Sequence, residues 1–305
     1  MNTAAVGADS VPRIDLAYAP VTTGVPASSQ VNVQDTEAPL LSDVDVNIPE
    51  TGLVNKNTIV AVIANENYKN ANVQNVEFAR NDGERFAEYC NKVLGVPSEQ
   101  IRARYDATLS EIVSTVKYLK TRTGMNPDKL DVIVYYAGHG KPDFNSDRNS
   151  CFLIPSDADG QDNDLCYSLD KLYAELDGMP ARSVTVFLDA CFSGVTRSGG
   201  MIDNARYVAK EVQDMKPQGR KVVFSAATGN QAAHPYKEKG HGFFTYFLLK
   251  SLQETRGDIT LGELAERMRE NVSNKVFDVK NAVQTPTVLA SDAIGSGWKT
   301  HKITD

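Results

Sequence analysis

The chain has 305 residues, 41% of them hydrophobic, which is enough to bury a sizeable core in one large domain or two small ones. It carries 32 basic and 39 acidic residues, and the formal charge of −7 argues against nucleic acid or an anionic membrane as its main partner. No apolar run approaches the roughly eighteen residues that a membrane-spanning helix needs, so no membrane span is expected.

The start of the chain shows no signal peptide, because it lacks a basic segment followed by an apolar one. The sequence leaves the compartment open. The four cysteines, Cys90, Cys151, Cys166 and Cys191, are too few for a disulfide framework in a chain this long. None of them has the Cys-x-x-Cys spacing that is typical of structural zinc.

Residues 1–50 differ in composition from the rest of the chain. They contain prolines at positions 12, 20, 26, 39 and 49 and show no helical period. This pattern is typical of a linker or of an extended strap that lies on the main domain. We expect residues 51–305 to form that domain.

From residue 58 onward, apolar β-rich runs alternate with segments of helical periodicity. In chain order the pattern predicts a strand at 58–64, a helix at 81–94, a strand at 101–105, a helix at 110–121, a strand that ends at 139, a short apolar piece at 151–155, a helix at 168–176, a strand that ends at 191, a strand at 221–227, and helices at 242–252 and 261–272. Strands separated by such helices predict an α/β domain with a parallel sheet covered on both faces. Ser110 is the expected N-cap of the second helix.

A histidine and a cysteine stand where two predicted strands end. His139 lies between two glycines, which let the backbone turn sharply and approach a ligand closely. Cys191 is followed closely by a serine and a glycine. Open α/β folds bind ligands at the carboxyl ends of their strands, and imidazole is the base best suited to activate a thiol. The pair therefore predicts a cysteine–histidine hydrolase, whereas the other three cysteines are expected in the core.

Asp189 precedes Cys191 by two residues. Because side chains alternate along a strand, both are expected on the same face of the sheet. The carboxylate then caps a helix, lies at the edge of the core, or acts as a specificity residue for a cationic substrate group.

These segments resemble those of the caspase-like cysteine peptidases of the metacaspase or bacterial orthocaspase type. The histidine segment reads Tyr-Tyr-Ala-Gly-His-Gly over 135–140, and the cysteine segment reads Asp-Ala-Cys-Phe-Ser-Gly over 189–194. His139 precedes Cys191 by 52 residues, close to the separation of about fifty residues in caspases. Further family-like segments lie at 222–227, 241–249 and 284–287, so the resemblance covers roughly residues 57–292.

The resemblance implies a caspase-like three-layer α/β/α sandwich with a mostly parallel central sheet. It also implies a cysteine endopeptidase with a His139–Cys191 dyad, in which the thiol attacks the scissile carbonyl and the imidazole protonates the leaving amine. The backbone N–H groups of Gly140 and Cys191 would form the oxyanion hole. The sequence points to no third catalytic residue, and neither a metal site nor a cofactor is predicted.

Asp189 stands where caspases carry a glutamine and where metacaspases carry an aspartate. A carboxylate in the S1 pocket, which receives the P1 side chain before the scissile bond, would bind arginine or lysine. Asp82 resembles the family's second pocket carboxylate, although the helix dipole also favours aspartate in a first helical turn. Ser225 resembles a further pocket residue. The expected partners are therefore proteins or peptides with arginine or lysine at P1.

Two rival interpretations stay open at this point. One is a catalytically silent caspase-like scaffold that binds partners, against which the joint presence of His139, Cys191 and Asp189 argues. The other is a related clan CD peptidase with a different P1 preference. The sequence does not predict the oligomeric state.

Three regulatory hypotheses follow. The loop 195–221 is either a solvated charged loop or a site of self-cleavage after a basic residue, with Arg197, Arg206, Lys210, Lys216 and Arg220 as candidates. The acidic segment 157–164 is weighed as a calcium site, because many metacaspases need calcium, but it lacks the EF-hand pattern and a solvated loop is favoured. Arg13 is considered as an inhibitory mimic of the P1 residue.

Overall fold

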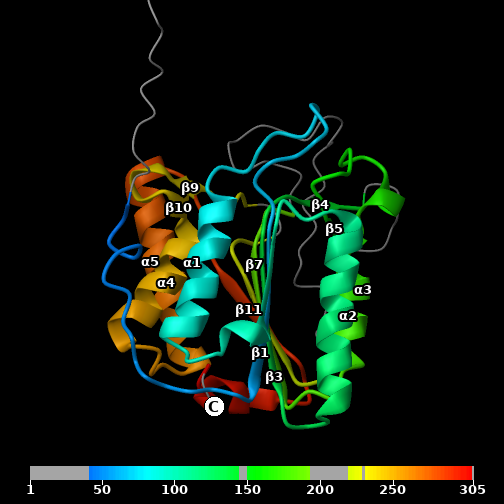
Figure 1. Ribbon diagram of the computed structural model, residues 1–305. Helices are drawn as coiled ribbons and strands as arrows, with labels where there is room; N and C mark the ends of the chain where they lie inside the picture. Colours follow the sequence, from blue (N-terminus) through cyan, green and yellow to red (C-terminus); the bar gives the residue numbers. More distant parts are fainter. Residues whose placement is uncertain (1–40, 144–149, 193–218, 229–230, 304–305) are drawn as a thin grey trace, which may run out of the picture. The chain divides into compact units, whose positions relative to one another are not determined.

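A six-stranded sheet with the order β11-β8-β7-β3-β1-β2 forms the centre of the computed structural model (Figure 1). The structure describes residues 41–143, 150–192, 219–228 and 231–303, all within the unit Pro39–Asp305. The strands are β1 (Thr58–Ala64), β2 (Ile101–Tyr105), β3 (Asp131–Ala137), β7 (Ser183–Asp189), β8 (Lys221–Ser225) and β11 (Thr287–Ala290). All pairs are parallel except that of β11 with β8 at one edge.

Helices cover both faces of this sheet (Figure 1). One face carries α1 (Ala79–Lys92), α4 (Phe243–Thr255) and α5 (Leu261–Lys280), and the other carries α2 (Leu109–Met125) and α3 (Leu169–Asp177). All seven residues of β1 and of β3 are buried, as expected for parallel strands with helices on both sides. The predicted three-layer α/β/α sandwich with a mostly parallel sheet is confirmed.

Short elements fill the connections between these layers. The connection after β3 forms a small antiparallel sheet of β4 (Gly140–Pro142), β5 (Cys151–Leu153) and β6 (Tyr167–Ser168). A hairpin of β9 (Pro235–Tyr236) and β10 (His241–Gly242) leads directly into α4. The 3-10 helices are η1 (Ser98–Gln100), η2 (Asn163–Leu165), η4 (Lys237–Lys239) and η5 (Gly295–Thr300).

The N-cap of α2 differs from the sequence prediction. Ser110 was expected to cap the helix, but the helix begins one residue earlier and Thr108 is the cap. The Thr108 hydroxyl accepts from the backbone N–H of Glu111, and the Glu111 carboxylate accepts from the backbone N–H of Thr108. This capping box pairs two backbone donors at once, which explains why Thr108 is preferred over Ser110.

The last part of the predicted N-terminal strap packs on helix α1 and η4. Val44 is fully buried, and its carbonyl accepts a hydrogen bond of 2.8 Å from the Tyr89 hydroxyl of α1. Asp43 forms an ion pair of 2.7 Å with Lys239. The remainder of the predicted strap, with Arg13, lies outside the described residues, as do positions 195–218 of the predicted self-cleavage loop.

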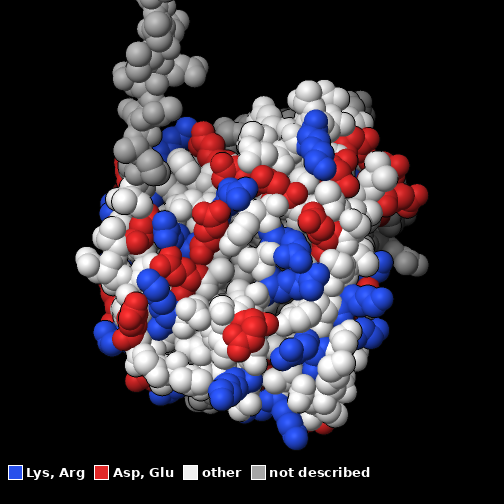
Figure 2. Space-filling model, in the orientation of Figure 1, with Lys and Arg blue, Asp and Glu red and all other residues white. Residues whose placement is uncertain are grey.

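Charges of both signs are interspersed on the face of the molecule that Figure 2 presents. Along α1, for example, Arg80 pairs with Glu84 at 2.9 Å, and Glu88 pairs with both Arg85 and Lys92. Pairs of this kind, with partly or largely exposed side chains, contribute little to stability. No helix among the described residues has the length and apolar character needed to cross a bilayer.

Close packing of α1 on β1 leads to a stability prediction. Gly83 faces β1, and a β-carbon at this position would lie 2.5 Å from the β-carbon of Ala64. We expect Gly83→Ala to lower the free energy of unfolding in urea by about 1–3 kcal/mol because of overpacking, although alanine is the better helix former by about 1 kcal/mol.

Gly124 in α2 provides the matched control, because a β-carbon there would meet no atom within 4 Å. Gly124→Ala should leave the free energy of unfolding unchanged or raise it by up to about 1 kcal/mol. If Gly83→Ala and Gly124→Ala change the free energy of unfolding equally, the close contact of α1 with β1 is not the cause of the Gly83→Ala effect.

Candidate active site

The two predicted reactive residues follow neighbouring strands. β3 and β7 pair in parallel, with Ala137 opposite Asp189 at their carboxyl ends. His139 and Cys191 each stand two residues beyond this pair. The contact continues past the strands, because the backbone N–H of Gly138 donates to the carbonyl of Asp189 at 3.3 Å. Both residues therefore leave the same edge of the sheet.

Gly140 brings the histidine segment against the cysteine segment. A β-carbon at position 140 would lie 2.5 Å from the ring of Phe192 and 2.9 Å from the carbonyl oxygen of Cys191. Only glycine tolerates this approach, so the glycine after His139 is explained by packing. The two predicted segments are in contact at the level of the backbone.

The imidazole of His139 is held by a backbone carbonyl. Its Nε2 lies 2.7 Å from the carbonyl oxygen of Gln74. A carbonyl can only accept, so Nε2 carries the proton and, in the neutral ring, the lone pair is on Nδ1. The Tyr68 ring lies 5.0 Å from the imidazole, and its hydroxyl accepts from the backbone N–H of His139 at 2.9 Å. Both the ring and the backbone of His139 are therefore fixed.

The thiol of Cys191 has its own backbone partner. Its Sγ accepts from the backbone N–H of Ala233 at 2.8 Å and lies 3.6 Å from the Ala233 carbonyl oxygen. An N–H donor stabilises the thiolate more than the thiol. Gln74 and Ala233 were not identified from the sequence, and since both act through the main chain no side-chain pattern points to them.

Asp189 lies at the end of a chain of buried hydroxyl groups. Its Oδ2 accepts from the Thr245 hydroxyl of α4 at 2.6 Å. Thr245 uses its single proton in this bond, so the Tyr135 hydroxyl, also at 2.6 Å, donates to Thr245 in turn. All three side chains are buried on the face that α1 and α4 cover. The carboxylate is thus oriented by the first turn of α4.

Asp82 lies over the same face, in the first turn of α1, and is also tied to the start of α4. Its Oδ1 is 2.8 Å from Nδ1 of His241, and both of its oxygens accept from the backbone N–H of Gly242. On the other side of the imidazole, Nε2 of His241 is 3.2 Å from Asp45. The structure therefore brings Asp82 and Asp189 to the same short segment of chain.

The two flanking carboxylates keep His241 protonated. Burial by itself lowers the pKa of His241, but the hydrogen bonds and charges of Asp45 and Asp82 outweigh it and raise the pKa from 6.5 to about 9. The same contact lowers the pKa of Asp45 against its burial, with further help from Ser42 and Arg85. No local sequence pattern indicates this network, because its members are far apart along the chain.

Ser225 is not brought to these carboxylates. It pairs with Leu188 in the sheet register, next to Asp189. Side chains alternate along a strand, and Val223 and Leu188 belong to the core on the α2 and α3 side. Ser225 therefore leaves the sheet on the face opposite to Asp189.

The acidic segment 157–164 uses its carboxylates within the chain. Asp157 accepts from the backbone N–H of Leu109, and Asp159 accepts from the backbone N–H groups of Gln161 and Asp162. Within the described ranges, no group of three or more histidine, cysteine or acidic side chains is arranged to hold a metal ion.

Comparison with known proteins agrees with this architecture. The sequence profile of the family described as "Caspase domain" matches residues 57–294. No curated protein sequence matches the chain significantly.

Two solved structures share the fold. One is a structural genomics target from Geobacter sulfurreducens, with a TM-score of 0.57 and 14% identity over 81% of this chain and 98% of that one. The other is caspase-1 from Spodoptera frugiperda, with a TM-score of 0.53 and 14% identity over 84% of this chain and 91% of that one.

The raised pKa of His241 predicts a pH-dependent stability. Below pH 6.5 the imidazole is protonated in both states and its stabilisation is complete; as the pH rises toward 9, the unfolded chain loses the proton that the folded chain keeps. We expect this group to withdraw about 3 kcal/mol of unfolding free energy over that interval. Urea unfolding at a series of pH values measures it.

His241→Gln removes the titrating group and is the variant for comparison. The buried thiols, such as Cys166 with its pKa raised by burial to about 11, contribute to both proteins, so the difference between the two pH profiles isolates His241. Asp45→Asn should partly reduce the slope of the unfolding free energy against pH. Parallel profiles for the wild type and His241→Gln would contradict the protonated network.

Proposed function

Because the chain belongs to the caspase-domain family, we propose that it is a cysteine endopeptidase with a His139–Cys191 dyad that cleaves after arginine or lysine. The family has the fold of clan CD cysteine peptidases and implies protein substrates. One observation carries the assignment of the dyad. The strands before both residues end in register, and Gly140 packs on the carbonyl of Cys191.

The contacts of each group support a two-step mechanism. The Cys191 thiol passes its proton to Nδ1 of His139, whose Nε2 is held by Gln74, and Sγ attacks the scissile carbonyl carbon. The N–H groups of Gly140 and Cys191 would stabilise the oxyanion that forms. When the C–N bond breaks, the leaving amine takes the proton from His139. Water, deprotonated by the same imidazole, then hydrolyses the thioester and restores the thiol.

Asp189 is the stronger candidate for recognition of a basic P1 side chain. Its Oδ2 accepts from the Thr245 hydroxyl, and it is the last residue of β7, two positions before Cys191. Asp82 shares its charge with the His241 imidazolium, so we propose for it a secondary part in the same pocket. The register of Ser225 favours no direct contact with the P1 side chain, and the proposed pocket rests on the two carboxylates.

A panel of fluorogenic peptides with arginine, lysine, aspartate or asparagine at P1 tests the specificity. We expect cleavage after arginine and lysine only, with arginine preferred. Asp189→Asn keeps an acceptor for Thr245 but removes the charge, and should lower kcat/KM for arginine by at least about a hundredfold with little change in melting temperature. The panel is run in EDTA and in millimolar Ca²⁺, which also tests the calcium hypothesis.

Asp278→Asn, which removes an exposed carboxylate from α5, is the matched control and should behave as the wild type. Parental cleavage after arginine by Asp189→Asn would overturn the pocket assignment. Cleavage after aspartate or asparagine instead would favour a clan CD peptidase of another preference. No cleavage of any peptide under either condition would favour a silent scaffold.

Self-cleavage in the loop 195–221 is a separate prediction. An enzyme with basic P1 preference should cut after one or more of the five candidate basic residues named above, and intact-mass spectrometry should find at least two fragments in the wild type. Cys191→Ala should stay intact, since removal of a nucleophile typically costs about 10⁴-fold or more in rate. Identical intact masses for the two proteins would remove self-cleavage from the proposal.

A further inference from the structure

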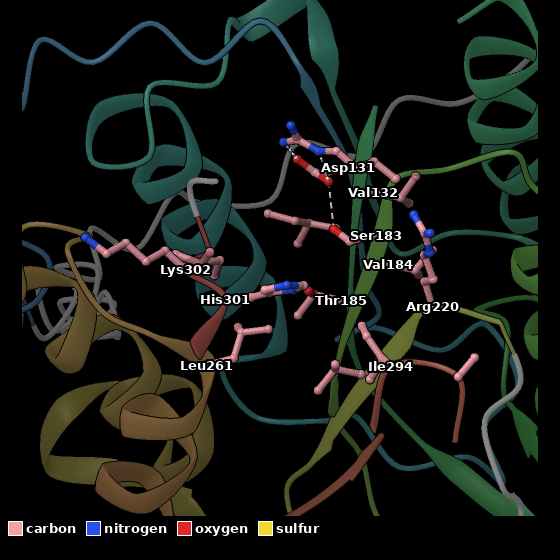
Figure 3. A pocket seen from close by; sticks show the side chains of 15 residues that line it. Asp131, Val132, Ser183, Val184, Thr185, Arg220, Leu261, Ile294, His301 and Lys302 are labelled. Carbon is pink, nitrogen blue, oxygen red and sulfur yellow. Dashed lines mark hydrogen bonds and ion pairs between the residues drawn. The ribbon is translucent and has the colours of Figure 1, made fainter. Parts of the chain in front are cut away.

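A cavity of about 470 Å³ lies at the amino-terminal ends of β3, β7 and β8 (Figure 3). This is the end of the sheet opposite to His139 and Cys191, which follow the carboxyl ends of β3 and β7. The start of α5 and the chain segment 293–303 complete its wall. A volume of this size is within the range of small-molecule sites, which is about 300–1,000 Å³.

Much of the lining is apolar and buried. The sheet contributes Ile133, Val184 and Val222, and the opposite wall contributes Leu261 and Ile303. Ile294 is half-buried beside them. The hydroxyl-bearing Thr185 is also buried here. Such walls suit the hydrocarbon part of a small molecule, whose transfer from water is favourable.

The charged lining is mainly basic. Arg182, Arg220 and Lys302 line the cavity together with His301, and Asp131 is the acidic residue among the lining side chains. The Asp131 carboxylate is already occupied, because it accepts from two nitrogens of the Arg182 guanidinium, Nε and Nη2, and from the Ser183 hydroxyl at 2.7 Å (Figure 3).

Arg220 is the cation best able to meet a ligand. It is exposed, and within the described part of the chain no carboxylate pairs with it, whereas Lys302 pairs with Asp258 at 2.5 Å. In a protein of formal charge −7, this wall is a local region of opposite sign. A guanidinium fork matches the geometry of a carboxylate or phosphate.

We propose that this cavity binds a small organic anion, in which a carboxylate or phosphate is attached to an apolar body. The anionic group contacts Arg220, and the apolar body lies against the wall between β7 and α5. The site is independent of the proposed peptidase activity, because it uses neither the dyad nor the S1 carboxylates.

Isothermal titration calorimetry on the full chain tests the proposal. Decanoate and decyl phosphate are the probes, and decanol and decyltrimethylammonium are matched neutral and cationic controls. We expect one site with a dissociation constant on the order of 100 µM for at least one anion, as ligand efficiency gives for this size. Comparison of the two dissociation constants shows whether the site prefers a carboxylate or a phosphate head group. The controls should bind at least about tenfold more weakly.

Arg220→Ala should weaken anion binding about tenfold, and Ile294→Trp, which fills the cavity, should abolish it. Arg269→Ala removes an exposed arginine of α5 and should leave binding unchanged. Circular dichroism verifies that each variant is folded. Equal binding of decanoate and decyltrimethylammonium, parental binding by Arg220→Ala, or no saturable binding of either anion up to about 5 mM would each overturn the proposal.

Discussion

The in-register pairing of β3 with β7 is the interaction on which the rest of the site depends. Parallel strands that start and end together bring residues with the same offset to adjacent positions, here His139 and Cys191. A shift of one residue would turn every side chain of β7 to the other face. Tyr135 and Phe187 belong to one core and Val134 and Val186 to the other, so burial on both faces opposes such a shift. The core therefore determines the geometry of the proposed dyad.

The first turn of α4 is the second constraint, because its hydrogen bonds hold the buried carboxylates of Asp82 and Asp189. An unpaired charge would be costly there. Asp82 is compensated by His241 and by the backbone N–H of Gly242, and Asp189 is compensated by the Thr245 hydroxyl. Asp82 also lies in the first turn of α1, where the helix dipole favours a negative charge. Removal of either carboxylate thus changes the packing of α4 as well as any pocket, which is why an isosteric amide is the informative substitution.

The sequence predicted those features that depend on local pattern. Short β-rich runs predicted the five parallel strands, and the ends of two of them predicted that His139 and Cys191 would stand at one edge of the sheet. Local pattern did not predict every helix end. Helix α5 continues to Lys280, eight residues beyond the predicted end, because Val276 extends its buried side. β11 escaped prediction because it is a short, half-buried edge strand.

Sequence patterns did not predict the contacts between segments that are far apart along the chain. Gln74 and Ala233 act through their main chains, and the Asp45–His241–Asp82 network joins three segments that only the fold brings together. Asp82 illustrates this limit of the sequence. Its position in the first turn of a helix was predicted, but no pattern indicated that its partner would be His241, 159 residues later.

The two ends of β3 and β7 therefore carry different kinds of chemistry. Glycines and buried carboxylates gather at the carboxyl ends, where the connections of an α/β fold leave room for ligands. The basic cavity at the amino ends has another origin, because it exists only where the segment 293–303 folds back over the starts of the strands. That segment follows β11, the last strand of the sheet. None of its residues takes part in the pairing of β3 with β7, so the ligand site at this end is built separately from the proposed dyad.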